Sequence, residues 1–184
     1  MEFKETKFSG VFELLPQIFE DERGYFFESF NQAEFEKYVP NTVFLQDNQS
    51  YSTKGVLRGL HFQKPPYAQG KLVRVIQGKV LDVIVDIRKG SPTYGEWGGF
   101  ELCAEKNNML YVAEGFAHGF VTIEDAIFTY KCTNTYHKAS EGGIIWNDLD
   151  LAIDWGIQKP NVSEKDMLLP NFQELTKQDT GFLY

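Results

Sequence analysis

The chain has 184 residues, a length that predicts a single domain, residues 1–184, able to bury roughly two-thirds of its unfolded surface. Its formal net charge of −8 opposes nonspecific attraction to nucleic acid or to an anionic membrane, because the overall field repels phosphate. Aromatic residues make up 15% of the chain, with 16 Phe and 9 Tyr, which favours a sheet-rich fold over a helical bundle.

The N-terminal stretch MEFKETKFSGVFELLP lacks the apolar segment of a signal peptide, and no later window reaches membrane-spanning length. The two cysteines, Cys103 and Cys132, fit no metal-binding spacing and provide no disulfide framework, so we expect both to be packed thiols. A reducing compartment would keep them in that form, and we predict a cytoplasmic protein.

Short runs of β-branched and aromatic residues recur along the chain, separated by Gly, Pro, Asn and Asp. Three segments have a helical pattern: Gln32–Lys37, Glu164–Met167 behind a Ser163 N-cap, and Phe172–Lys177. The pattern predicts an all-β sandwich or barrel, mainly antiparallel, with a few short helices. In chain order, the predicted strands are Val11–Leu15, Tyr25–Phe30, Val43–Gln49, Val56–Gln63, Lys71–Ile76, Val80–Arg88, Gly99–Cys103, Met109–Val112, Gly119–Ile123, Ala126–Thr135 and Ile144–Trp146.

Two polar side chains, Arg58 and His61, interrupt the apolar run GVLRGLHFQ. Burying an unpaired charge is costly or shifts a pKa, so these residues suggest a strand that lines a polar, ligand-filled cavity. In a straight strand the two side chains would point to opposite faces. If both serve one site, Gly59 must form a bulge or bend, which glycine permits.

Strict alternation of apolar and polar residues runs through KLVRVIQGKVLDVIVDIR on either side of Gln77-Gly78-Lys79. The alternation predicts two strands joined as a hairpin, with Lys71, Val73 and Val75 on one face. A cation on an inward face of such a strand indicates a ligand-filled interior.

The chain has three histidines, of which His61 and His118 lie in apolar surroundings and His137 in a polar turn. Taken alone, such a histidine is more often a hydrogen-bonded core residue than a catalyst. Two further strand cations, Arg74 and Arg88, either face a ligand or extend their charged ends into solvent. The sequence leaves both orientations open.

The segment FTYKCTNTY places two phenols on one face of a predicted strand. At about 3.3 Å per residue, Tyr130 and Tyr136 would stand roughly 20 Å apart. They are therefore suited to contact opposite ends of an elongated ligand.

Eight motifs, read in order, together resemble the dTDP-4-dehydrorhamnose 3,5-epimerase family of deoxysugar epimerases, and the match runs collinearly from about residue 10 to residue 170. The resemblance implies a double-stranded β-helix, or jelly roll, of cupin type with the ligand inside the barrel. It also implies a homodimer with an exchanged N-terminal strand. The motifs are DERGYFFESFN, QDNQSYS, GVLRGLHFQ, QGKLVRVIQGKVLDVIVDIR, SPTYGEW, EGFAHGF, YKCTNTY and SEKD.

Three catalytic residues follow from the resemblance: His61 as general base, Asp166 as its partner carboxylate, and Tyr130 as proton donor on the opposite face of the sugar. A carboxylate on one imidazole nitrogen fixes the tautomer and stabilises the imidazolium that forms when the other nitrogen accepts a proton. A phenol suits the donor role if nearby cations ease its ionisation or its proton is resupplied, since its ordinary pKa is about 10.

The implied reaction converts dTDP-4-dehydro-6-deoxy-D-glucose into dTDP-4-dehydro-L-rhamnose by proton removal and return at C3 and C5, without a cofactor. Negative charge develops on the keto oxygen, so the site needs fixed donors there. By the resemblance Lys71 and Arg58 are these donors, and His118 either contacts the sugar or stabilises the same charge. The resemblance further assigns Phe19 and Phe26 either to the pocket wall or, as we expect, to ordinary core packing. The substrate-binding residues it implies are Arg23, Glu28, Gln46, Asn48, Arg58, Lys71, His118, Tyr136, Glu141 and Lys165, with Arg23, Arg58 and Lys165 at the diphosphate and Tyr136 stacked on thymine.

Other activities stay open. Cupin-type barrels often bind a metal through an HxH pair, but here the pair reads His61-Phe62-Gln63 and Lys71 stands where a carboxylate ligand would be expected, so we predict no metal. Relatives that epimerise only C3 or C5, or that are 3,4-ketoisomerases, are a second alternative. A non-catalytic sugar-nucleotide-binding barrel is a third, and it would have no need of a paired His61 and Asp166.

Overall fold

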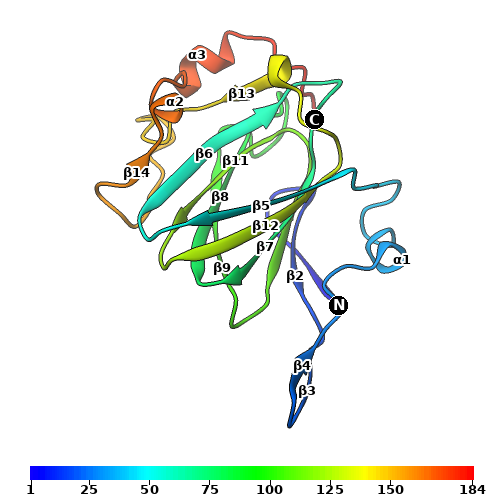
Figure 1. The fold of residues 1–184 in the computed structure, drawn as a ribbon. Helices are drawn as coiled ribbons and strands as arrows, with labels where there is room; N and C mark the ends of the chain where they lie inside the picture. The colour runs from blue at the N-terminus through cyan, green and yellow to red at the C-terminus, as the bar shows by residue number, and fades with distance from the viewer.

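The computed structural model describes all of residues 1–184 and contains two six-stranded sheets that pack face to face as a barrel (Figure 1). The first sheet has the strand order β1 (Glu2–Glu5), β2 (Val11–Leu15), β10 (Met109–Val112), β7 (Lys71–Gln77), β12 (Ala126–Cys132) and β5 (Gln46–Ser52). The second has the order β13 (Glu141–Gly143), β6 (Val56–Gln63), β11 (Phe116–Thr122), β8 (Lys79–Asp86) and β9 (Trp97–Cys103), with β14 (Asn161–Val162) parallel to β6.

All other strand pairs are antiparallel, and the predicted all-β jelly roll of cupin type is confirmed. Helical structure is limited to α1 (Gln32–Phe35), α2 (Glu164–Met167), α3 (Phe172–Thr176) and one 3-10 turn at Lys138–Ser140. Ser163 caps α2 by accepting a hydrogen bond from the backbone N–H of Asp166, as predicted. None of these helices has the length and apolar content needed to cross a membrane.

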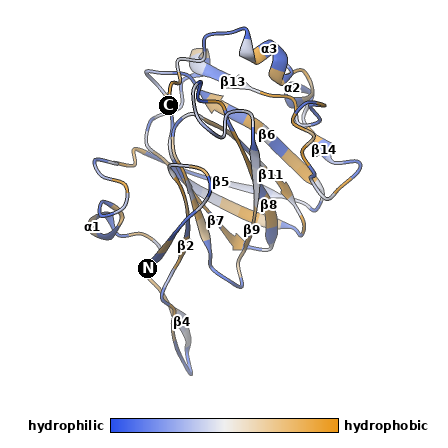
Figure 2. Cartoon of the chain, turned by 180° about the vertical axis from the view of Figure 1, so that it is seen from behind, coloured by the Kyte–Doolittle hydropathy of each residue, from blue (hydrophilic) through white to orange (hydrophobic).

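Alternate residues of the strands fill the space between the two sheets. On β8, Val80 and Ile84 face this interior and pack with Phe120 and Phe128, whereas Val83 and Val85 face outward. The outward face is covered by the C-terminal segment, which forms a second hydrophobic core with it. The residues that this segment contributes are Leu151, Trp155, Phe172, Leu175 and Phe182. Figure 2 shows the resulting alternation of hydrophobic and hydrophilic colours along β6.

The predicted hairpin across Gly78 is wrong, because β7 pairs with β10 and β12 while β8 pairs with β11 and β9. Gly78 has a φ of +74°, and a Cβ there would lie 2.0 Å from the carbonyl oxygen of Asp125, so only glycine fits the point where the chain passes between sheets. Alternation could not distinguish the two arrangements, since each strand turns one face to the interior. The predicted shared face holds: Val73 and Val75 pack in the interior and Lys71 lines a cavity there.

The predicted strand Tyr25–Phe30 is shorter in the structure. β4 (Gly24–Phe26) pairs with β3 (Phe19–Asp21) in a hairpin that projects away from the barrel (Figure 1). Phe19 and Phe26 are 55% and 68% exposed, so the expected core packing of both rings is wrong. In the structure the hairpin is left uncovered by the rest of the chain, and the pattern of aromatic residues gave no sign of this.

Several other predicted boundaries shift. Strand β5 begins at Gln46 rather than Val43, and β13 ends at Gly143, before the predicted strand Ile144–Trp146 begins. Cys103 and Cys132 are both buried and unbonded to one another, which confirms their packing role.

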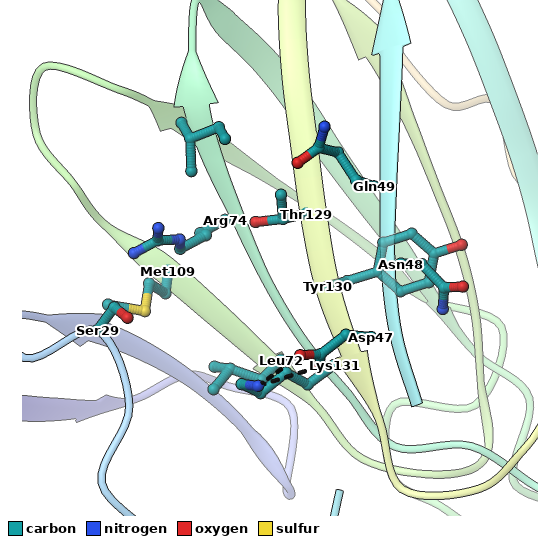
Figure 3. Close-up of a pocket in the computed structure, with 11 residues that line it drawn as sticks. Ser29, Asp47, Asn48, Gln49, Leu72, Arg74, Met109, Thr129, Tyr130 and Lys131 are labelled. Carbon is teal, nitrogen blue, oxygen red and sulfur yellow. Dashed lines mark hydrogen bonds and ion pairs between the residues drawn. The ribbon is translucent and has the colours of Figure 1, made fainter. Parts of the chain in front are cut away.

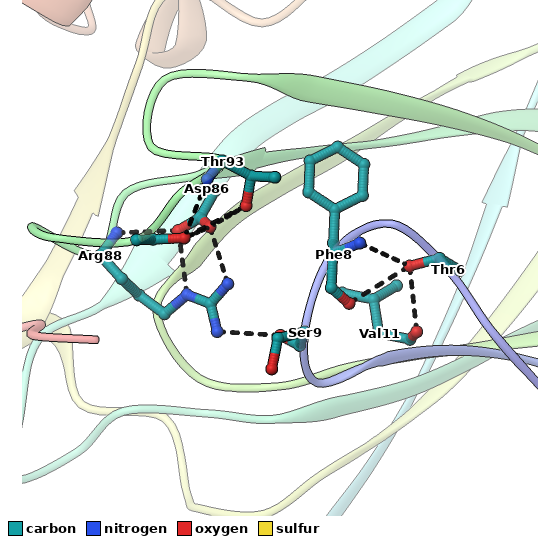
Figure 4. Close-up of polar contacts among 8 residues, drawn as sticks. Thr6, Phe8, Ser9, Val11, Asp86, Arg88 and Thr93 are labelled. Carbon is teal, nitrogen blue, oxygen red and sulfur yellow. Dashed lines mark hydrogen bonds and ion pairs between the residues drawn. The ribbon is translucent and has the colours of Figure 1, made fainter.

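A buried ion pair contacts the N-terminal segment at Ser9 (Figure 4), and its cation also lies over the ring of the C-terminal Tyr184. The fully buried Asp86 carboxylate accepts hydrogen bonds from Nε and Nη2 of Arg88, at 2.9 and 2.7 Å, and from the hydroxyls of Ser91 and Thr93, at 2.6 Å each. Nη1 of Arg88 donates to the backbone carbonyl of Ser9. The guanidinium lies over the rings of Phe116 and Tyr184. Arg88 is therefore an inward-facing structural residue.

We expect Arg88→Met to lower the free energy of unfolding by about 3 to 5 kcal/mol, because it leaves the Asp86 carboxylate buried without its cation. For a chain of this size that corresponds to a fall in Tm of about 6 to 20 °C, measurable by calorimetry. Lys106→Met is the matched control, since its pair with Glu101 is exposed and contributes under about 1 kcal/mol. An equal loss in both variants would contradict the assignment.

The stability from Asp86 should also depend on pH. Burial alone would raise its pKa, but the hydrogen bonds from Arg88, Ser91 and Thr93 outweigh burial and hold it below the ordinary value of 3.8. A carboxyl whose pKa is lowered by folding stabilises the protein above its unfolded pKa, and this contribution is lost as the pH falls through the folded pKa. The difference in Tm between Arg88→Met and the original protein should therefore become smaller as the pH is lowered below 4, as thermal unfolding at a series of pH values would show.

Candidate active site

Strand β6 bulges at Gly59. His61 pairs with His118 of β11, yet Arg58 pairs with Phe120, so β6 has one residue more than β11 over this stretch. Gly59 has a φ of +127°, and a Cβ there would lie 2.6 Å from the Cα of Gly119. The predicted bulge is confirmed, and through it both Arg58 and His61 line one cavity.

The imidazole of His61 is held by a buried carboxylate. Its Nε2 lies 2.8 Å from Oδ1 of Asp166, whose side chain is only 6% exposed, whereas that of His61 is 32% exposed. The other carboxylate oxygen, Oδ2, accepts the backbone N–H of Gly59 at 3.2 Å. Burial would raise the pKa of Asp166, but these hydrogen bonds outweigh it and hold the pKa below its ordinary value. The carboxylate therefore stays charged at neutral pH, and Nδ1 is the nitrogen of His61 left free to take a proton.

The cavity beside this pair, which we call the dyad cavity, has a volume of about 500 Å³ and lies between the two sheets. The rings of Phe120 and Phe128 belong both to its lining and to the interior core, so they form an apolar wall. The polar residues that line it are Ser50, Arg58, His61, Lys71, His118, Tyr130, Asn161, Ser163, Lys165 and Asp166.

Two cations of the dyad cavity can act as fixed donors. Burial lowers the pKa of Lys71, an effect partly offset by the nearby Cys132 and Asp82, and its ammonium has no hydrogen-bond partner within the chain. The guanidinium of Arg58 is oriented by Ser52, whose hydroxyl accepts from Nε at 3.0 Å. Both side chains are available to a ligand that carries negative charge.

Tyr130 lines the same cavity from β12, on the sheet opposite the strand of His61. Burial, and the nearby Cys132, raise the pKa of the phenol, while Arg58 acts in the opposite direction. The hydroxyl therefore keeps its proton at neutral pH, and the guanidinium stabilises the phenolate formed when that proton is given up.

An adjoining cavity of about 370 Å³, which we call the Tyr136 cavity, shares three lining residues with the dyad cavity. The Tyr136 hydroxyl donates to Glu141 at 3.2 Å, and Glu141 accepts from Lys165 at 2.6 Å. Gln46 accepts the backbone N–H of Tyr136 at 2.8 Å and donates to Asn48 at 2.9 Å. The residues common to both cavities are His61, Lys71 and Tyr130.

The two cavities form a site for an elongated anionic ligand, with a base and a phenol at one end and an exposed aromatic ring at the other. The family described as dTDP-4-dehydrorhamnose 3,5-epimerase matches residues 5–174 of this chain. The chain belongs to that family.

Relatives within the epimerase family match over most of their length. The dTDP-4-dehydrorhamnose 3,5-epimerase of Shigella flexneri is 54% identical over 164 residues, which cover 88% of this chain and 91% of that protein. The 3,5-epimerase of Legionella pneumophila, solved in complex with dTDP-4-keto-L-rhamnose, has a TM-score of 0.92 at 42% identity and covers 100% of this chain and 98% of its own. A 3′-monoepimerase of Streptomyces bikiniensis, solved in complex with dTDP-quinovose, has a TM-score of 0.88 at 31% identity, and the match covers 94% of this chain and 88% of that one.

Most residues predicted for an epimerase site line one of the two cavities, but Arg23 and Glu28 do not. Arg23 lies in the turn of the projecting β3–β4 hairpin, where its guanidinium pairs only with Asp21. Glu28 follows the hairpin and is exposed. Within one copy of the chain, therefore, these two side chains are apart from the predicted substrate contacts.

Arg74 faces a different hollow, of about 420 Å³, on the other side of β5, β7 and β12 (Figure 3). In Figure 3, Tyr130 and Asn48 point away from Arg74 and Met109, as expected for alternate residues of a strand. The question left open for Arg74 is thus resolved: it does not enter the dyad cavity.

The sequence interpretation missed Asp82, a fully buried carboxylate behind His118. The signal was present, since Asp82 interrupts the apolar run VLDVIV much as Arg58 and His61 interrupt theirs. No three His, Cys, Asp or Glu side chains gather in a way that could hold a metal ion.

Proposed function

We propose that this chain catalyses the 3,5-epimerisation of dTDP-4-dehydro-6-deoxy-D-glucose to dTDP-4-dehydro-L-rhamnose, without a cofactor. The observation that carries the proposal is the pair of His61 and Asp166 facing the same cavity as Tyr130, in a member of the epimerase family. The 3,5-epimerase of Shigella flexneri is 54% identical to it, against 31% for the monoepimerase of Streptomyces bikiniensis.

Proton abstraction falls to Nδ1 of His61. The carbons that flank a keto group are acidic because the electron pair left behind moves onto the carbonyl oxygen as an enolate. Asp166 stabilises the imidazolium that forms on His61. Lys71 and Arg58 hold positive charge where the enolate oxygen develops, and they do so in a cavity that is partly closed to water.

Inversion requires that the new proton arrive from the other face of the ring. Tyr130 comes from the opposite sheet and keeps its proton until the carbanion is present. Protonation by the phenol inverts the centre. His61 then gives its proton to solvent and the Tyr130 phenolate takes one from solvent, after which the same step at the second carbon completes the reaction. No hydride and no electron leaves the substrate, so the chemistry balances with proton transfer alone.

The nucleotide end of the substrate would occupy the Tyr136 cavity, with Lys165 and Arg58 near the diphosphate. We expect Tyr136→Ala to weaken dTDP binding by about 1 to 3 kcal/mol, because it removes the ring on which the base would stack. Isothermal titration calorimetry measures this directly. Tyr136→Phe is the control, since it keeps the ring and loses only the bond to Glu141; a similar loss in both variants would argue against stacking.

The test of the activity is solvent exchange. Incubated with the 4-keto substrate in heavy water, the protein should place deuterium at both C3 and C5 and yield the L-lyxo sugar, as followed by proton NMR. Deuterium at a single carbon would identify a monoepimerase, and movement of the keto group a 3,4-ketoisomerase. Binding without exchange at either carbon would leave a sugar-nucleotide-binding barrel and overturn the proposal.

We further propose a homodimer in which the β3–β4 hairpin of one copy enters the other copy's site. The support is the exposure of Phe19 and Phe26 on a projecting hairpin and the absence of Arg23 from the lining of both cavities of its own chain. Insertion would bury both rings and bring the Arg23 guanidinium to the diphosphate. Because the chain has a net charge of −8, binding a diphosphate requires local positive charge of this kind.

This arrangement predicts complementation between two impaired variants. In a mixed dimer of Arg23→Ala and His61→Asn, one site carries both substitutions and the other carries neither. Co-expression of the two variants should therefore restore exchange that neither homodimer shows. If the co-expressed mixture is no more active than the two variants alone, Arg23 acts within its own chain or not at all.

A further inference from the structure

The dyad cavity holds a second histidine bound to a buried carboxylate. Nε2 of His118 lies 2.9 Å from each of the two carboxylate oxygens of Asp82. The side chain of Asp82 is completely buried and that of His118 is 7% exposed. Asp82 lies on β8 and His118 on the neighbouring β11, and both side chains face the interior between the sheets.

A buried carboxylate requires a donor, and His118 is the group that hydrogen-bonds to Asp82. Burial lowers the pKa of His118, and the neighbouring Lys71 and His61 lower it further, while Asp82 acts in the opposite direction. The balance favours a neutral ring. A neutral ring that donates to Asp82 must carry its proton on Nε2, which leaves a lone pair on Nδ1.

Nδ1 of His118 is open to the cavity. No protein group hydrogen-bonds to it, and the chain's only buried polar side-chain atoms without a partner are the hydroxyls of Ser50 and Thr180. His118 also pairs directly with His61 across β6 and β11, so the two side chains are near neighbours on one face. The free nitrogen of His118 is thus presented close to the catalytic base.

We propose that Asp82 is a positioning residue that holds His118 as an Nε2–H tautomer, so that Nδ1 accepts a hydrogen bond from a hydroxyl of the hexose beside His61. This proposal rests on the function proposed above. Lys71 and Arg58 then serve the enolate oxygen, and His118 serves as the acceptor that fixes the orientation of the ring. The sugar is then oriented by donors, Lys71 and Arg58, and by an acceptor, His118. Cations alone could not do this, because Lys and Arg side chains carry no acceptor.

Nitrogen-15 NMR tests the tautomer in the unaltered protein. The chain has only three histidines, so each ring can be assigned by single substitution. We expect His118 at neutral pH to show the proton on Nε2 and a free Nδ1. A ring protonated on Nδ1, or a doubly protonated ring, would overturn the proposal, and this result does not depend on any activity.

Asp82→Asn tests whether the tautomer of His118 matters for solvent exchange. The amide can donate to Nε2 and thereby shift the proton to Nδ1, which places a donor where the hydroxyl needs an acceptor. We expect kcat/KM for solvent exchange to fall about 100-fold, because the ring of the sugar is misplaced relative to His61. The affinity for dTDP, which lacks the hexose, should stay within about 2-fold of the original value.

The matched control is Asp148→Asn, which alters another buried carboxylate, one bonded to backbone N–H groups of Leu151 and Phe172 away from both cavities. It should change stability but not exchange. Exchange in Asp82→Asn at the original rate, or an equal loss of dTDP affinity, would overturn the positioning role. Failure of the unaltered protein to exchange would instead overturn the proposed function and leave the tautomer measurement as the test of Asp82.

Discussion

His61→Asn should reduce deuterium incorporation at C3 and C5 by about 10² to 10⁴-fold, because a positioned general base contributes a factor of that size. Asparagine is chosen because its amide can still donate to the Asp166 carboxylate, so the buried charge keeps a partner. The affinity for dTDP should stay within about 2-fold, because dTDP lacks the hexose on which His61 is proposed to act.

The matched control is His137→Asn, which makes the same change at a histidine outside both cavities. Its ring stacks on Tyr67 and its Nδ1 lies 2.9 Å from the Ser140 hydroxyl, so the variant should lose little exchange activity. Exchange rates come from proton NMR in heavy water and dTDP affinities from calorimetry. Substantial exchange by His61→Asn would remove His61 from the role of base, whatever its contact with Asp166.

The partnership of His61 and Asp166 shows how far sequence reasoning reached. The two residues are separated by 105 positions, and the segment SEKD has the composition of an ordinary solvated helix start. Spacing alone could not have joined them, and the pairing came from the family resemblance. What the residues themselves did indicate was the cavity, because Arg58 and His61 could share a face only through a bulge at Gly59.

Other features depend on contacts that no local pattern carries. The alternation around Gly78 is satisfied equally by a hairpin and by two strands in opposite sheets, and the choice is made by how each strand pairs with β10, β11 and β12. The sequence predicted a helix at Phe172–Lys177 but not what it covers, and in the structure Phe172 and Phe182 complete the core outside the second sheet. In both cases the deciding partners are distant in sequence.

The projecting hairpin is a different case. Its aromatic residues were expected to pack in a core, and the expectation assumed that burial must occur within one copy of the chain. Large exposed rings on Phe19, Tyr25 and Phe26 instead mark a surface that is suited to a partner. A single sequence cannot state whether an apolar segment is covered by its own chain or by another copy.

Tyr130→Phe should separate proton exchange from inversion, which no substitution at His61 can do. The phenol makes no hydrogen bond within the chain, so its loss removes a proton donor without leaving a partner unsatisfied. His61 can still remove the proton and return a deuteron to the same face. We therefore expect deuterium to enter sugar that keeps its original configuration, while formation of the L-lyxo product falls about 10² to 10⁴-fold.

The measurement is proton NMR of the recovered sugar nucleotide, which reports deuterium content and configuration in one experiment. Tyr51→Phe is the control, because Tyr51 lies on the outer face of β5 and its hydroxyl donates to Asp125, away from both cavities. Inversion by Tyr130→Phe at the original rate would assign the second proton to another group or to water. Loss of exchange together with inversion would mean that the phenol is needed for proton removal as well, and that the two faces of the sugar are not served by separate residues.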